Sequence, residues 1–375
     1  MTSGVPQEHA DLVVVGAGIV GLAHAVAAVR RGLSVVVVER DEHATGATVR
    51  NFGHGCVTAQ QGAALEYALA ARGEWLRLAR EAGVWLRDAG TVVLARAEDE
   101  HAVLAEFAEA RHGDVHLLDA AGVARRVPAG PEVTGGAWLP LDVRVDPRQA
   151  AHAIAAWLAG QGVRFLWSTA AWSVEPGRVR TSRGEVTADA VVLAVGHDLD
   201  RHFPDLAEQA GVVRCGLHML RVRDPRPGTP IDPAVLTGFS LLRYAGFGDC
   251  PSLPAVRARL TATHPDLVAA GLNLMFTQLP GGDLTIGDTH AYGRTLDPYR
   301  DEALDEAVLA ETARLLGTGP LTVRERWHGV YAASTAQDFL VATPAPGVRA
   351  VAVTSGIGMT TALGLAPRIL DDLLP

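Results

Sequence analysis

Short apolar runs alternate with amphipathic stretches along the first part of the chain. An apolar run from Asp11 to Val15 leads into Gly-Ala-Gly-Ile-Val-Gly and then into an Ala/Val-rich stretch that continues to Arg31. Residues 33–38 form a second run, rich in valine. Strands that are apolar along their whole length are typical of parallel sheets buried on both faces. The pattern predicts a strand, a helix and a second parallel strand.

The same style returns later in the chain. Leucines and alanines at helical spacing predict a helix over residues 65–82, and Pro147 suits the first turn of another helix that reaches about Ala159. Apolar runs at 163–167, 190–195 and 350–354 predict strands, and residues 359–374 a closing helix. These pieces predict one nucleotide-binding domain built from discontinuous segments.

The intervening segments have a different texture. Residues 91–95 and 115–118 read as strands of another layer, and residues 212–324 show short strands, Pro-rich turns and one helix, 301–316. We therefore expect an α/β protein with a Rossmann-type domain (1–84, 145–211 and 325–375) and an inserted α+β substrate domain with a mixed or antiparallel sheet (85–144 and 212–324). Two domains also suit a chain of 375 residues.

Charge and composition exclude several classes of function. All 33 basic residues are arginine, against 42 acidic residues, so the net charge is −9. Without lysine there can be no Schiff-base chemistry, covalent pyridoxal phosphate or P-loop. The acidic balance argues against a nucleic-acid partner.

Cysteine content and hydropathy suggest the compartment. Three cysteines without a CxxC pair favour a reducing cytoplasm and no metal site. The uncharged stretch 12–29 has no arginine before it to act as the basic part of a signal peptide, and glycines interrupt it. We expect a soluble protein with no membrane partner, either a monomer or a homo-oligomer.

The first glycine-rich segment has the sequence context of a dinucleotide site. Gly16, Gly18 and Gly21 allow a tight turn, close approach of a pyrophosphate, and close packing of helix on strand. The pyrophosphate would lie at the N-terminus of the helix. Glu39, at the end of the second strand, is placed to bind a ribose diol. NAD and FAD both fit this unit.

Three further segments favour FAD, because they resemble the D-amino acid oxidase-like family of amine oxidoreductases, which includes glycine and sarcosine oxidases. These are ATGATVRNFGHG from Ala44, VVLAVG ending at Gly196, and TSGIGMTT from Thr354. The resemblance covers essentially the whole chain. It implies a cofactor site made of Gly16, Gly18, Ile19, Val20, Gly21, Glu39, Arg40, Thr48, Arg50, Asn51, Ala171, Gly196, Gly356, Ile357, Gly358, Met359 and Thr360. Family members with covalent flavin use a cysteine in the C-terminal part, where this chain has none, so we expect non-covalent FAD.

Within that family, RNFGH from Arg50 and LRYAGF from Leu242 look most like a clade associated with phosphonate-degradation genes. The resemblance implies oxidation of a C–N bond, with hydride transfer to flavin. Arginine suits a phosphonate because its planar fork binds two oxygens. Amino-acid-oxidising relatives carry a carboxylate-binding arginine just after Trp327; here arginines stand earlier, at 324 and 326, which argues against an α-amino acid substrate.

Each candidate catalytic residue has a structural alternative. Arg50 and His54 would contact flavin or substrate, or support the loop; Arg243 would bind the anion, or form a surface salt bridge. The remaining candidates are Tyr244, Met275, His328 and Tyr331, with Thr277 and His290 on nearby strands. Met275 could equally be core.

The sequence thus predicts an FAD-dependent oxidase of a small anionic amine, favouring a relative of 2-aminoethylphosphonate that is N-methylated or hydroxylated. Products would be an aldehyde, ammonia or methylamine, and hydrogen peroxide. Alternatives are a glycine- or sarcosine-type oxidase, an amine dehydrogenase with another acceptor, or a flavin-binding subunit without its own activity. Sarcosine-oxidase-like relatives use a lysine to activate oxygen. Here Arg50, His54 or His328 would do so, or oxygen is not the acceptor.

Overall fold

The apolar runs at the N-terminus lie at the centre of an eight-stranded sheet, called the first sheet. In the computed structural model, which describes residues 9–375, β1 (His9–Val15) pairs in parallel with β2 (Val35–Val38) and β12 (Gly184–Leu193). The strand path is β10 (Ala171–Glu175), β11 (Arg178–Thr181), β12, β1, β2 and β9 (Arg164–Leu166). Beside β12 lies β19 (Val348–Val353), which pairs with β18 (Phe339–Ala345).

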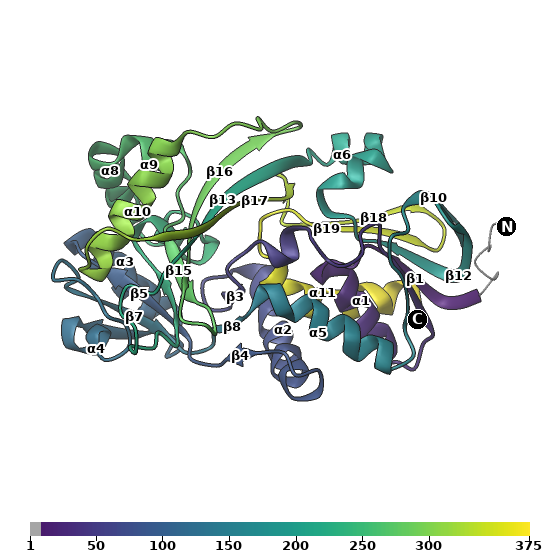
Figure 1. Ribbon diagram of the computed structural model, residues 1–375, viewed down its shortest axis with the longest axis horizontal. Coiled ribbons are helices and arrows are strands. Elements are labelled where there is room, and N and C mark those ends of the chain that lie inside the picture. The colour runs from purple at the N-terminus through teal and green to yellow at the C-terminus, as the bar shows by residue number, and fades with distance from the viewer. Residues whose placement is uncertain (1–8) are drawn as a thin grey trace.

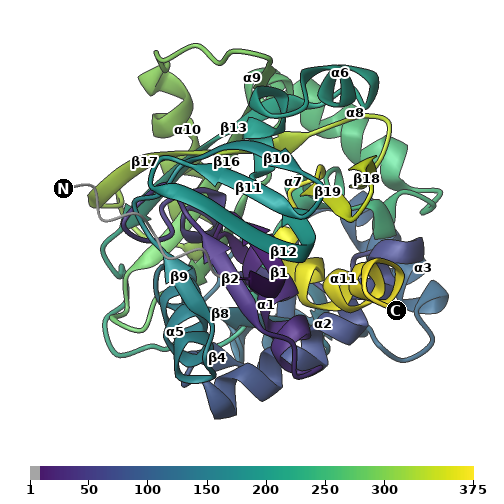
Figure 2. The ribbon, with the colours of Figure 1, turned by 90° about the vertical axis from the view of Figure 1, so that its right-hand side faces the viewer.

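Both faces of the first sheet are covered, which explains why β1 and β2 are apolar throughout. Leu12 and Val14 pack into one hydrophobic cluster with the helices α1 (Ile19–Val29), α2 (Gly62–Glu81), α5 (Pro147–Gly160) and α11 (Gly358–Leu373). Val13 and Val15 face the other way, against residues of β11 and β18. Figure 2 shows α1, α5 and α11 on one side of β1 and β2, and β10 and β11 on the other.

A second eight-stranded sheet forms the other lobe of the molecule (Figure 1). Its order is β17 (Val323–Ala333), β13 (Val213–Val222), β16 (Leu284–Gly293), β15 (Met275–Gln278), β14 (Ala234–Leu236), β5 (Thr91–Ala95), β7 (Gly135–Leu139) and β6 (His116–Asp119). Neighbours are antiparallel except β14 and β5, which are parallel. The chain is therefore an α/β protein, as expected; both large sheets are mixed, the first with a parallel centre and antiparallel margins and the second mostly antiparallel.

A small third sheet lies between the lobes and joins β3 (His54–Gly55), β8 (Val143–Val145) and β4 (Leu86–Arg87). We keep the two-domain division as a proposal. Its boundary at 324/325 falls inside β17, which pairs with β13 over nearly its whole length. The first eight residues of the expected range 1–84 lie outside the described residues.

The expectation of one helix within residues 212–324 is wrong. Besides α10 (Glu302–Leu316), the segment contains α7 (Gly238–Leu241), α8 (Leu253–Thr263) and α9 (Pro265–Ala269). The sequence signal of α8 is weak because only Val256 and Leu260 are buried, and Pro254 stands in its first turn. A narrow apolar stripe beside Pro-rich turns resembles a loop.

The remaining elements are short or lie at the surface of the two lobes. They are α3 (Glu98–Ala110), α4 (Ala120–Ala124), α6 (Pro204–Gln209) and the 3-10 turns η1 (Ala47–Val49), η2 (Gly196–Arg201) and η3 (Ala245–Phe247). No helix within residues 9–375 has both the length and the apolar character needed to cross a membrane.

Candidate active site

A cavity of about 790 Å³ runs from the β1–α1 turn of the first sheet to strands β15–β17 of the second. Most of the residues predicted to bind the cofactor line it: Gly16, Gly18, Ile19, Val20, Glu39, Arg40, Thr48, Asn51, Ala171, Gly196, Gly356, Ile357, Gly358, Met359 and Thr360. Gly21 and Arg50 do not line it. The tertiary structure thus gathers segments that are far apart in the sequence along one elongated cavity.

Two positions of the β1–α1 turn have no room for a side chain and therefore require glycine. Gly16 has φ +105°, and a Cβ there would lie 2.5 Å from the carbonyl oxygen of Ala194. A Cβ on Gly21 would overlap the Gly16 carbonyl oxygen, which explains why the position outside the cavity wall is also glycine. Because α1 begins at Ile19 directly at the cavity, its first turn offers an anion-binding position; the Ile19 N–H itself donates to Thr48 Oγ1, so the donors left for an anion are those of the residues that follow.

Two side chains shape the floor beside this turn. Glu39 Oε2 accepts a hydrogen bond from the Ala17 N–H at 2.7 Å, and Oε1 accepts from the Asp41 N–H at 3.1 Å. The carboxylate is therefore fixed at the end of β2, where a ribose diol would donate to it. Thr48 Oγ1 accepts from the Ile19 N–H at 2.8 Å and thereby joins the loop after β2 to the start of α1.

The C-terminal glycine turn forms the opposite wall. Gly356 has φ +78°, and a Cβ there would come within 3.0 Å of the Tyr331 ring. Helix α11 begins at Gly358, so its first residues Gly358 and Met359, whose N–H groups a helix start leaves without intrahelical partners, line the cavity, while the Thr360 N–H donates to the Ile357 carbonyl. Ser355 also lines the cavity, and its buried Oγ has no hydrogen-bond partner among the described residues. Two helix N-termini, a fixed carboxylate and glycine clearances fit a flavin dinucleotide.

The other end of the cavity contains a cation, Arg243, whose side chain is accessible from the cavity. Arg243 Nη2 donates to the Tyr331 hydroxyl at 2.7 Å, and Nη1 donates to the Tyr292 hydroxyl at 3.3 Å. In the part of the chain that the structure describes, no carboxylate lies within ion-pair distance of this guanidinium. Burial holds the pKa of Tyr331 well above its usual range, so its hydroxyl stays neutral. Arg243 therefore keeps its charge available for an anion, unlike a salt-bridged surface arginine.

Tyr244 and Met275 lie together on the wall near Arg243. The Tyr244 hydroxyl donates to Met275 Sδ at 3.6 Å, and burial raises the pKa of Tyr244 well above its usual range. Met275 is 1% exposed but lines the cavity, so it is both core and wall. Four of the predicted catalytic residues, Arg243, Tyr244, Met275 and Tyr331, are thus gathered at one end of the cavity, where a substrate would lie.

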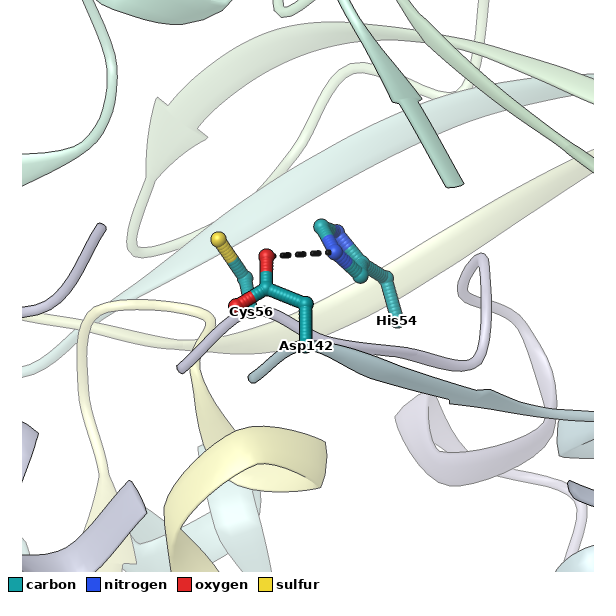
Figure 3. A group of neighbouring side chains, drawn as sticks. All are labelled: His54, Cys56 and Asp142. Atoms are coloured by element: carbon teal, nitrogen blue, oxygen red, sulfur yellow. Dashed lines mark ion pairs between the residues drawn. The ribbon is translucent and has the colours of Figure 1, made fainter. Parts of the chain in front are cut away.

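His54 lines the same cavity as part of a buried group with Cys56 and Asp142 (Figure 3). His54 Nε2 lies 2.7 Å from Thr91 Oγ1 and 3.4 Å from Asp142 Oδ2. Asp142 Oδ1 accepts from the N–H groups of residues 57 and 58. The possible ligand atoms of the three side chains lie within 4.8 Å of one another. We assign this group a structural role, since these hydrogen bonds tie the wall segment 54–58 to β5 and to the turn before β8.

Arg50 and His328 do not line the main cavity. Arg50 Nη1 donates to the His328 carbonyl at 3.0 Å, and the Arg50 side chain lines a separate hollow of about 280 Å³ with Arg148 and Trp327. The His328 ring stacks on His218, with ring centroids 4.9 Å apart. Asn51 supports its own loop, because Nδ2 donates to the carbonyls of residues 47 and 48.

Of the remaining candidates, too, some line the cavity and others do not. Thr277 donates to the Phe52 carbonyl at 3.0 Å and does not line the cavity, whereas His290 does. Arg326 points away, to Glu302 and Asp305. Several wall residues were not among the sequence candidates, and Asn273 and Asp288 are two of them. The signal available for Asp288 was an acid within β16, whose first residues carry no other charge.

Comparison with known proteins gives a family. The model of the family DAO, described as FAD dependent oxidoreductase, matches residues 11–371. A curated relative is the tRNA 5-methylaminomethyl-2-thiouridine biosynthesis bifunctional protein MnmC of Chromohalobacter salexigens, 26% identical over 407 residues. The match covers 99% of this chain but only 55% of the relative, so the chain spans little more than half of that protein.

Solved structures share the fold at low sequence identity. Glycine oxidase from Geobacillus kaustophilus has a TM-score of 0.77 at 19% identity, over 98% of this chain and 95% of that one. L-alpha-glycerophosphate oxidase from Mycoplasma pneumoniae, solved with FAD bound, has a TM-score of 0.75 at 17% identity, over 97% and 95%. At such identities the likeness concerns the fold alone.

Proposed function

The chain belongs to the DAO family of FAD-dependent oxidoreductases, and from this premise we propose that it oxidises the C–N bond of a small amine that carries an anionic group. The observation that carries the proposal is Arg243. Its guanidinium lines the substrate end of the cavity and, within residues 9–375, its hydrogen bonds go to neutral hydroxyls. A cation that is open to a cavity and has no carboxylate at ion-pair distance favours an anionic ligand.

When bound, FAD supplies the acceptor for the hydride that leaves the carbon next to nitrogen. The chain's own residues bind the cofactor and the substrate and orient them toward each other. The N–H groups at the start of α1 would hold the pyrophosphate, and Glu39 a ribose. The N–H groups at the start of α11 would face the flavin pyrimidine and favour negative charge there. Arg243 would fix the anionic end of the substrate, and Tyr331 would hold the guanidinium in place.

Among anionic amines we favour an aminophosphonate related to 2-aminoethylphosphonate. Support comes from the donors at this end of the cavity, because the planar fork of Arg243 presents paired N–H groups to a tetrahedral oxyanion. No second arginine follows Trp327 on β17 to hold an α-carboxylate. A glycine-type amino acid is the second candidate, supported by the fold shared with glycine oxidase.

We propose molecular oxygen as the electron acceptor. Of the three residues considered for its activation, Arg50 and His328 lie outside the cavity wall; His54 lines the cavity, but its hydrogen bond to Thr91 belongs to the group to which we assign a structural role. Burial lowers the pKa of His328, with a smaller effect from Arg300 and Arg50, so that ring is poorly suited to carry charge. Transfer of electrons to another carrier, as in a dehydrogenase, is the competing possibility.

Anaerobic flavin reduction tests the proposal. The FAD-loaded protein would be mixed with glycine, sarcosine, D-alanine, 2-aminoethylphosphonate and its N-methyl derivative, and bleaching of the flavin absorbance followed. We expect the aminophosphonates to reduce the flavin fastest. The same reactions in air should yield one peroxide per amine oxidised; reduction without peroxide would identify a dehydrogenase. If no amine bleaches the flavin, the proposed function is wrong.

A further inference from the structure

A buried carboxylate faces the substrate end of the cavity without a full set of donors. Asp288 is 5% exposed, lines the cavity, and its Oδ1 has no hydrogen-bond partner among the described residues. Burial raises the pKa of the carboxyl, although His290, Arg243, its own backbone N–H and a hydrogen bond with the Asn273 side chain partly offset this. A buried acid with a free acceptor atom is costly unless a ligand supplies the missing donor.

His290 adds a second acceptor beside it. Its Nδ1 lies 2.7 Å from the Gly271 carbonyl oxygen, so Nδ1 must be the protonated nitrogen that donates. Burial lowers the pKa of His290, which leaves the ring neutral near neutral pH. Its other nitrogen, Nε2, then presents a lone pair 3.6 Å from Asp288 Oδ2. Two acceptors face each other, and a proton or an N–H group is required between them.

Asn273 contributes a third acceptor. Its buried Oδ1 has no hydrogen-bond partner in the described part of the chain, and the residue lines the same cavity. The backbones of Asn273 and Asp288 exchange two hydrogen bonds of 2.9 Å, which fixes the two side chains on neighbouring segments of the second sheet. These three side chains make the wall near Arg243 rich in acceptors.

We propose that Asp288, together with Asn273 and His290, binds the amino group of the substrate as an ammonium ion and accepts one of its protons. This inference rests on the proposed function, because Arg243 then binds the anionic group of the same molecule. An ammonium ion brings several N–H donors, which is the element that the three acceptors lack. A carboxylate and a guanidinium in one cavity select a zwitterion over a simple anion or a simple amine.

The proton transfer is a single balanced step. One ammonium N–H bond breaks, an O–H bond forms on Asp288, and the products are a neutral amine and a neutral carboxylic acid. The nitrogen lone pair that this step releases is what oxidation of the adjacent carbon requires. The raised pKa of Asp288 brings the carboxyl closer to the amine in proton affinity, which makes the transfer less unfavourable than to an exposed aspartate.

Asp288→Asn tests the inference, because the substitution keeps the shape and removes the charge. For each amine that reduces the flavin of the unmodified protein, binding is compared with that of its counterpart without nitrogen: acetate for glycine and ethylphosphonate for 2-aminoethylphosphonate. We expect Asp288→Asn to weaken the amine about 10- to 100-fold, as for loss of a charged hydrogen bond. Binding of the nitrogen-free counterpart should be unchanged or stronger. Equal weakening of both ligands, or of neither, would overturn the inference.

The pH profile gives a second readout. In the unmodified protein, kcat/KM should fall at low pH as Asp288 becomes protonated. In Asp288→Asn this loss should disappear, and the pH dependence of kcat/KM should reflect only the protonation of the substrate's own amino group. The groups that act electrostatically on Asp288 are His290, Arg243, Tyr244 and Cys215, and all remain in the variant. An acid limb that is identical in both proteins would assign the titration to another group and contradict the proton transfer.

Asp283→Asn is the matched control. Asp283 directly precedes β16, pairs with Arg221, and does not line the cavity. It should retain the affinity for both ligands. Failure of the proposed function is distinguishable, because then no amine reduces the flavin of the unmodified protein. If this inference alone fails, the amine still reduces the flavin of the unmodified protein. In that case Asp288→Asn binds the amine as tightly as Asp283→Asn does.

Discussion

At the scale of the single residue, the site depends on two opposite charges on the cavity wall, of which Asp288 is buried and Arg243 is open to the cavity. Arg243 and Asp288 lie in the same cavity wall, and within residues 9–375 the guanidinium has no carboxylate at ion-pair distance and Asp288 Oδ1 has no donor. A charge interacts more strongly with a ligand inside a cavity than in bulk water, because the surrounding protein is less polarisable than water. The specificity of the protein is therefore expected to depend on these two side chains.

Replacing Arg243 by methionine should raise KM for an anionic amine. Loss of one charge-assisted contact costs about 1.5–3 kcal/mol, or roughly 10- to 100-fold in KM. An uncharged amine should not show this loss, so the ratio of the two KM values is the measurement. Arg294→Met is the control, since Arg294 is 71% exposed and lies outside the cavity. An unchanged KM for the anionic amine would remove Arg243 from the substrate site.

His24 makes stability depend on pH. It is fully buried in α1, where burial lowers its pKa from 6.5 to about 4. A lowered pKa in the folded state means that its contribution is present above pH 6.5 and is lost as the pH falls toward 4. The shift corresponds to about 3 kcal/mol. Urea unfolding at a series of pH values should therefore show a shallower acid loss for His24→Leu than for the unmodified protein. Parallel profiles would contradict this.

At the scale of the element, the β1–α1 turn brings backbone rather than side chains to the cofactor. Its glycines are required for clearance, and the N–H groups that follow Ile19 in the first turn of α1 are available because a helix start leaves its donors without intrahelical partners; the Ile19 N–H donates to Thr48. The turn also fixes Glu39, since the Ala17 N–H donates to that carboxylate. Cofactor binding is therefore expected to fail when a side chain replaces a glycine of the turn, even if the protein still folds.

Gly16→Ala should yield protein with little FAD. The new Cβ would lie 2.5 Å from the Ala194 carbonyl oxygen, and φ +105° is strained for alanine. Gly32→Ala is a close control, because Gly32 also has a positive φ of +76° but no described atom lies within 4 Å of the added methyl group. The measurement is the FAD content per chain after purification. Full flavin content in Gly16→Ala would exclude this turn as the pyrophosphate site.

At the scale of the whole molecule, the cavity exists because two sheets meet around it. The first sheet supplies helix starts and the carboxylate that suit a dinucleotide, and the second supplies Arg243, Tyr331 and Asp288. The third sheet and the His54 group connect the two lobes beside the cavity (Figure 3). Substrate and cofactor sites are thus expected to be coupled through packing.

Acid precipitation tests how the cofactor is held. We expect FAD to remain in the yellow supernatant, because only Cys56 among the cysteines lines the cavity and burial raises the pKa of its thiol well above the usual range. A protonated thiol is a poor nucleophile toward flavin. A yellow pellet that survives washing would show covalent attachment, and its loss in Cys56→Ser would identify the bond.

The sequence by itself determined what depends on local chemistry. The spacing of apolar residues and their types predicted the strand–helix–strand unit, and the glycines with Glu39 predicted the dinucleotide turn. Both depend on residues that are close in the sequence, so the local pattern is enough to specify them. Absence of lysine excluded whole reaction classes. The family resemblance indicated FAD, and the family match bears this out.

Only the tertiary structure decided which distant side chains share the cavity. Arg50 and Arg243 looked alike as candidates, but the direction of the loop turns Arg50 toward the His328 carbonyl, whereas Arg243 faces the cavity. Asp288, Asn273 and His290 form an acceptor cluster only because the segment before β15 pairs with β16. Burial and unpaired acceptors arise from packing of segments far apart in the chain, and no local pattern encodes them.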